Sequence, residues 1–140
     1  MKALTISQPY ASLIASGEKW VENRTWHTSY RGPLAIHAGQ KSSYLTPKEL
    51  RSYPTGVVVA TCELLGCLNL SEAERYYWQG AFYPEARQMG WGNAGLLSFL
   101  ENEYTDGPWC WILANVKKLE IPIPAIGKQR FWEFELSKKP

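Results

Sequence analysis

One short stretch of the 140-residue sequence, GEKWVENRTW, concentrates side chains whose chemistry suits a polar ligand. Its charged and aromatic members are Lys19, Trp20, Glu22, Arg24 and Trp26. An arginine binds phosphate through paired hydrogen bonds, a lysine acts as a mobile point charge, and a tryptophan ring stacks on a base. The stretch therefore predicts that Lys19 and Arg24 contact phosphate or base edges, while Glu22 orients them or accepts a base amine. Trp20 and Trp26 are candidates for a stacking platform.

The same residues also have a purely structural interpretation. Glu22 and Arg24 could form an ion pair that orders a strand, and the two tryptophans could pack a core, which is the commoner role of large aromatic side chains. The residue types do not choose between the two interpretations.

The flanking residues predict the elements that position this stretch. A short strand at residues 3–6 precedes a helix, for which Ser7 is the expected cap and Pro9 lies in the first turn. Gly17 suits the left-handed position that ends a helix. An extended segment from Lys19 to Trp26 follows, and its alternating side chains place one set of residues on a common face. This set is Trp20, Glu22, Arg24 and Trp26.

The rest of the chain reads as strands with short helices between them. Strands are expected at residues 34–38, 56–65, 109–116 and 131–136. Capping boxes at Thr46–Glu49 and Ser71–Glu74 begin two helices. The segment 80–107, rich in Gly and aromatic residues, is interpreted as an insertion or lid with one helix at residues 93–100. Together these elements predict an α+β fold, a small mixed barrel with short flanking helices, in a single domain over residues 1–140.

The net charge of +2 is unevenly distributed. Residues 1–51 carry seven Lys or Arg and three acids, residues 52–106 two and seven, and residues 107–140 six and three. If the two ends meet in the fold, they could form one basic face suited to a phosphate-bearing ligand. Charges scattered over the solvent-exposed surface are the alternative.

Other features predict where the protein resides. The chain shows no signal peptide and no apolar run long enough to span a membrane. The odd number of cysteines, Cys62, Cys67 and Cys110, favours reduced thiols in the cytoplasm. The spacing of Cys62 and Cys67, with no second pair, does not indicate a zinc site, so we expect no resident metal and no membrane partner.

The motif G-x-K-x-x-E-x-R, formed here by Gly17, Lys19, Glu22 and Arg24, resembles that of the ASCH (activating signal cointegrator homology) family. The neighbouring stretches ISQPYASLIASG, YRGPLAIHAG and GPWCWIL also resemble the family, over about residues 4–136. The resemblance implies a fold similar to the PUA domain, a mixed β pseudo-barrel. It also implies a cleft lined by the motif that binds RNA or a modified nucleotide.

The resemblance implies enzymatic alternatives as well. Some members are ribonucleases, and here Glu22 could act as the base and Lys19 or Arg24 as the stabilising charge. No cofactor is expected otherwise, but a divalent metal could assist such a nuclease. A small subfamily resembles amidohydrolases that remove an acyl group from cytidine. Those members carry a threonine where this sequence has Glu22, which argues against their mechanism. Their second acid would correspond to Glu63, Glu72 or Glu74, and the sequence does not choose among them.

Two further candidates complete the sequence-based predictions. His37 alternates with Leu34 and Ile36 and would face the cleft or solvent, where it could carry a proton or bind the ligand. A hydrogen-bonded structural histidine is the alternative. The aromatic segment 80–107 could dock a protein partner, which would make the chain an interaction module.

Overall fold

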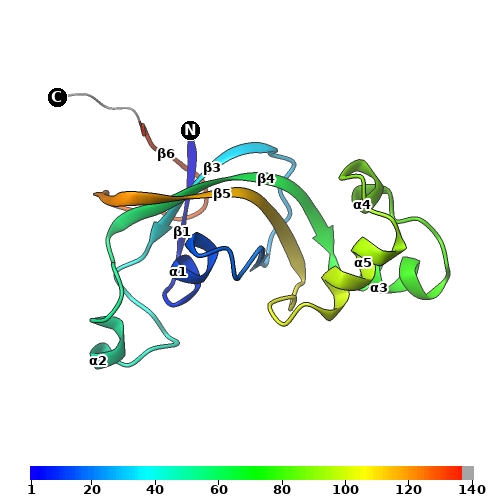
Figure 1. The fold of residues 1–140 in the computed structure, drawn as a ribbon, viewed down its shortest axis with the longest axis horizontal. Coiled ribbons are helices and arrows are strands. Elements are labelled where there is room, and N and C mark those ends of the chain that lie inside the picture. The colour runs from blue at the N-terminus through cyan, green and yellow to red at the C-terminus, as the bar shows by residue number, and fades with distance from the viewer. Residues whose placement is uncertain (137–140) are drawn as a thin grey trace. The chain divides into compact units, whose positions relative to one another are not determined.

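The computed structural model describes residues 1–136 and contains one six-stranded sheet in the order β2-β5-β4-β3-β1-β6 (Figure 1). The strands are β1 (Lys2–Ile6), β2 (Val21–Arg24), β3 (Gly32–Ala38), β4 (Val57–Asn69), β5 (Trp109–Pro124) and β6 (Trp132–Glu133). The helices are α1 (Tyr10–Ala15), α2 (Pro47–Leu50), α3 (Leu70–Trp78), α4 (Pro84–Gln88) and α5 (Asn93–Glu101). The sheet is mixed, because β1 pairs parallel with β3 and antiparallel with β6.

These elements confirm the α+β class with short helices. The described strands form an open sheet with β2 at one edge and β6 at the other. The sheet is therefore not a closed barrel, which is consistent with the predicted pseudo-barrel. Among residues 1–136, none of the helices has the length and apolar character of a membrane span.

The chain divides into two compact units. Unit 1 comprises Met1–Lys19, Pro33–Glu63 and the stretch from Asn115 onward, and unit 2 comprises Trp20–Gly32 and Leu64–Ala114. In β5 the boundary falls at Asn115, whose φ of 52° lies in the left-handed region that a strand residue normally avoids. The prediction of one domain over residues 1–140, with 80–107 as an insertion or lid, stays a prediction.

The core of unit 1 forms where the two ends of its chain meet. The terminal amine of Met1 donates to the carbonyl of Phe134 at 2.7 Å, and β6 pairs with β1. A buried cluster joins both ends to β3 and β4: Ala3, Ala35, Val58, Trp132 and Phe134. The meeting of the ends, on which the predicted basic face depended, is therefore present.

The core of unit 2 is formed by residues of β2, of β4 and β5, and of three helices. Its buried members include Val21, Leu68, Ala73, Leu96, Phe99 and Ile112. Helices α3, α4 and α5 each contribute a residue to this core, and α3 and α5 contact each other directly (Figure 1). Of these helices, the sequence did not predict α4.

The structure corrects several predicted boundaries. Ser7 does not cap α1, whose N-cap is Pro9 without a side-chain hydrogen bond. Asn69 caps α3 by accepting from the Glu72 N–H at 3.0 Å, so Ser71 lies inside the helix. The capping box of Thr46 and Glu49 is confirmed.

The strand lengths also differ from those predicted. The segment 19–26 is a strand only from Val21 to Arg24, because it pairs only with residues 109–112 of β5. The central strand β4 continues to Asn69, and the closing strand is reduced to two residues. Ladder hydrogen bonds to a neighbouring strand, rather than local propensity, determine these ends.

Candidate functional site

The first part of the motif follows helix α1 in unit 1. Gly17 has a φ of 86°, and its N–H bonds to the Ile14 carbonyl, which confirms it as the terminator of the helix. The Lys19 N–H then bonds to the Leu13 carbonyl at 3.0 Å. The Lys19 side chain is only 3% exposed, and its Nζ lies 5.5 Å from the centre of the Tyr10 ring. The motif thus holds a buried cation against an aromatic face.

The second part of the motif lies on β2 in unit 2. Arg24 Nε lies 3.0 Å from Glu22 Oε2 in an ion pair, and Glu22 is 7% exposed. The two residues pair with Trp111 and Trp109 of β5 in the antiparallel ladder. The ion pair that the structural interpretation predicted is therefore present, and the attraction between the opposite charges favours this orientation of the guanidinium.

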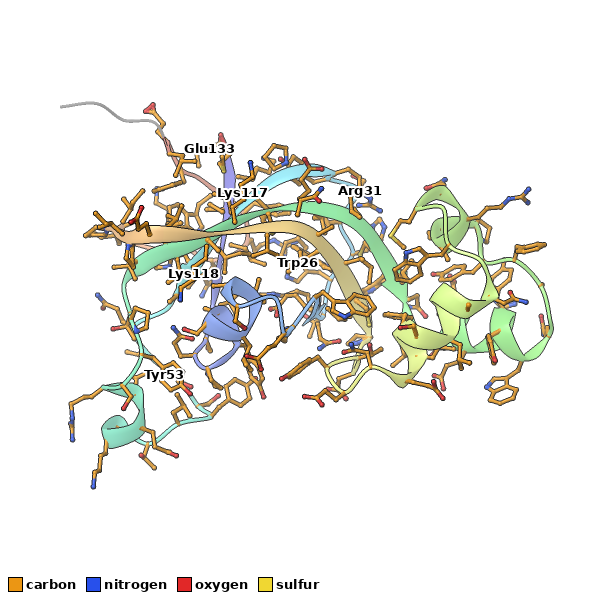
Figure 2. All side chains as sticks on the ribbon, viewed as in Figure 1. Trp26, Arg31, Tyr53, Lys117, Lys118 and Glu133 are labelled. Carbon is orange, nitrogen blue, oxygen red and sulfur yellow. The ribbon has the colours of Figure 1, made fainter. Side chains whose placement is uncertain are left out.

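Both tryptophans of the stretch pack against other indoles of unit 2. The Trp26 ring meets Trp111 edge to face at 4.7 Å, and its carbonyl accepts a long hydrogen bond of 3.4 Å from Trp111 Nε1. Figure 2 shows Trp26 beside β5. Trp20 meets Trp91 edge to face at 6.1 Å and packs on the core of its unit. Packing is thus observed for both rings, and base stacking stays a prediction.

Asn23, which the sequence analysis did not single out, organises a loop beside the motif. Its amide donates to the Tyr104 carbonyl at 2.7 Å. Its carbonyl oxygen accepts from the N–H groups of Asp106 and Gly107 at 2.9 and 2.8 Å. One side chain therefore fixes the chain that leads into β5. An amide on the strand face opposite Glu22 is the only sequence signal that pointed to this role.

His37 is buried, at 2% exposure, which corrects the expectation that it faces a cleft or solvent. The carbonyl of Ala125 can only accept, so His37 Nε2 donates to it at 2.8 Å. Nδ1 lies 3.1 Å from Thr5 Oγ1, which accepts in turn from Trp132 Nε1 at 3.1 Å. The ring is covered because the Trp132 indole packs edge-on at 5.3 Å. His37 is therefore in the environment of a hydrogen-bonded structural histidine, which was the alternative interpretation.

The three candidate second acids lie at different places. Glu63 is exposed on β4, Glu72 is in the first turn of α3 with the Tyr83 hydroxyl 3.4 Å from its carboxylate, and Glu74 lies further along α3. Across the described residues, no three His, Cys, Asp or Glu side chains gather as a metal site would require.

All three cysteines are free thiols and buried. Burial raises the pKa of Cys62 and of Cys110 to about 12, and it also raises the pKa of Cys67. A buried protonated thiol behaves as a small apolar side chain.

The formal charges separate along the division into units. Unit 1 carries eleven Lys and Arg against six Asp and Glu, a net charge of +5. Unit 2 carries four against seven, a net charge of −3. The exposed pair Lys117 and Lys118 lies on β5 within unit 1 (Figure 2).

Comparison with known proteins gives consistent matches. The family model described as ASCH domain matches residues 4–123. The chain is 25% identical to activating signal cointegrator 1 of Homo sapiens and 24% identical to that of Mus musculus. These alignments cover 94% of this chain and 22% of either relative, so the chain spans about a fifth of their length. The chain is also similar to the crystal structure of ASCH from Zymomonas mobilis, with 18% identity and a TM-score of 0.49. That alignment covers 88% of this chain and 72% of the Zymomonas mobilis chain.

Proposed function

This chain belongs to the ASCH domain family, and from that premise we propose that it binds RNA or a nucleotide through its G-x-K-x-x-E-x-R motif. Lys19 and Arg24 contact phosphate or base edges of the ligand. Glu22 holds Arg24 in the orientation needed for that contact. Gly17, the first residue of the motif, ends helix α1.

The observation that carries the proposal is the state of the motif's charged side chains. Lys19 and Glu22 are 3% and 7% exposed, and Arg24 is held at Nε by Glu22 at 3.0 Å. Burying charges is costly, and pairs of this kind contribute little to stability compared with apolar residues of similar size. A preorganised cation that needs no reordering is well suited to bind an anionic ligand. The net charge of +5 on unit 1 favours the same kind of ligand.

Cleavage of RNA with Glu22 as the base is the second candidate. Glu22 is a carboxylate held in place within the motif, as a general base must be. Its ion pair with Arg24 favours an orienting role over proton transfer, so binding is the primary proposal. The amidohydrolase alternative has less support, because Glu22 replaces the reactive threonine.

The experiment measures retention and cleavage of a short labelled single-stranded RNA, with and without a divalent metal. Lys19→Met keeps the apolar stem beside Tyr10 and removes the charge. The matched control is Lys48→Met, which removes an exposed lysine from α2 in the same unit. Loss of one charged hydrogen bond to the ligand is expected to weaken binding about tenfold. The slope of log affinity against log salt should fall by about 0.7.

Three outcomes decide between the candidates. If the Lys19→Met variant folds normally and retains RNA as well as the wild type does, the proposed site is refuted. Cleavage that disappears in Glu22→Gln, while retention persists, makes the protein a ribonuclease. Retention without cleavage supports binding alone.

A further inference from the structure

A groove with a cavity volume of about 580 Å³ lies between α3 and α5, entirely within unit 2. Its lining from α3 includes Leu70, Glu74, Tyr77 and Trp78, and its lining from α5 includes Leu97 and Glu101. Residues spaced by three or four positions share a helix face, so each helix presents one continuous face to the groove.

These faces border the core, since Leu70 and Tyr77 pack against its buried cluster, but they are not its fully buried part. Helix α3 buries Ala73, and helix α5 buries Leu96 and Phe99. Leu70 and Leu97 in the groove are only half-buried, and Trp78 is 80% exposed. The Trp78 indole and the outer part of the half-buried leucines therefore leave an apolar surface in contact with solvent.

The groove combines this apolar surface with negative charge. Glu74 and Glu101 are both exposed, and within residues 1–136 neither carboxylate makes an ion pair or a side-chain hydrogen bond. The rings of Tyr77 and Trp78 stand nearly perpendicular, at 81° with centroids 5.3 Å apart. Aromatic faces attract organic cations, and carboxylates add Coulomb attraction to the same charge.

We propose that this groove docks a basic, amphipathic segment of a protein partner. Lysine or arginine side chains of that segment place their charged ends at Glu74 and Glu101. Their methylene stems and the segment's aliphatic residues lie against Trp78, Tyr77 and Leu97. Tryptophan and tyrosine are the residues that most often dominate such interfaces.

The charge of the groove distinguishes this partner from the ligand of the proposed function. Unit 2 has a net charge of −3, and two carboxylates in the groove would repel the phosphates of RNA. The inference therefore does not depend on RNA binding at the motif. Failure of either proposal leaves the other intact.

The test uses the whole protein and a synthetic peptide that alternates lysine with leucine, with blocked termini. Its binding is followed by fluorescence anisotropy. Trp78→Ala removes the exposed indole, and Glu74→Lys with Glu101→Lys reverses the groove charge. The matched control is Glu85→Lys, which makes the same charge reversal on α4, outside the groove lining.

We expect Trp78→Ala, and separately the double reversal, to weaken peptide binding about tenfold. Glu85→Lys should have little effect, and RNA retention should be unchanged in every groove variant. A partner peptide in which glutamate replaces lysine should not bind.

Several results would overturn the inference. These are the absence of peptide binding, equal binding by wild type and the groove variants, or equal binding of the glutamate peptide. Binding of free spermidine as tight as that of the peptide would also contradict a protein segment as the occupant. Because Trp78 is 80% exposed, its substitution by alanine should not impair folding.

Discussion

Arg24 Nε lies 3.0 Å from Glu22 Oε2, and this contact joins two residues of the motif on one face of β2. The carboxylate is mostly buried and the guanidinium partly exposed, at 10% and 24% of their side chains. The pair therefore has both a structural role, in ordering the strand, and a role in presenting Arg24. These two roles make different predictions for substitutions.

Arg24→Ala should destabilise the fold, because it removes a partner of a mostly buried carboxylate. We expect the free energy of unfolding to fall by about 2 kcal/mol, measured by urea denaturation. The double variant Glu22→Gln with Arg24→Ala should be more stable than Arg24→Ala alone, because it does not bury a Glu22 carboxylate that has lost its arginine. A single variant as stable as wild type would show that the pair has no structural role.

Asn23→Ala should release the loop that leads into β5. The substitution leaves the Asp106 and Gly107 N–H groups and the Tyr104 carbonyl without this partner. A loss of about 2–3 kcal/mol is expected, with faster hydrogen exchange at the Asp106 and Gly107 amides. Asn23→Asp keeps the acceptor and should retain protection at those amides. Unchanged exchange in Asn23→Ala would contradict the assignment.

Gly127→Ala should disturb the buried histidine. A Cβ at Gly127 would lie 2.7 Å from His37 Nδ1 and in steric conflict with Thr5 Oγ1. We expect about 1–3 kcal/mol of destabilisation from the overpacking. Gly92→Ala is the control, because a Cβ there meets nothing within 4 Å. Thermal denaturation of both variants makes the comparison, and equal melting temperatures would argue against tight packing around His37.

Stability should decrease with alkaline pH because of the buried thiols. Burial raises the pKa of Cys62 and of Cys110 from an ordinary 9.0 to about 12. The unfolded chain loses these protons first, so this contribution to stability is complete below pH 9.0 and is lost as pH rises towards about 12. Urea midpoints measured across this range should fall, and Cys62→Ala should make the decline shallower.

The same burial predicts the reactivity of the thiols. Below pH 9.0 the native protein should react slowly with iodoacetamide, and urea should restore rapid labelling of all three cysteines. Rapid labelling of the native protein would mean that the thiols open to solvent more often than their burial suggests.

Local chemistry in the sequence predicted several features correctly. Gly17 ends a helix, Thr46 and Glu49 form a capping box, and the motif from Lys19 to Arg24 could be located from its residue types alone. These features depend on backbone conformation and contacts within a few residues, which the order of the residues specifies directly. The mixed α+β class also followed, because the pattern of apolar residues distinguishes strands from helices.

Only the tertiary structure decided how those residues are used. Lys19 is buried over Tyr10, Asn23 holds a loop more than eighty residues away in sequence, and His37 is enclosed with Thr5, Ala125 and Trp132. The groove between α3 and α5 exists because the two helices contact each other at the border of the unit 2 core. Such arrangements depend on which distant segments pack together, and a pattern read over a few neighbouring residues carries no information about that pairing.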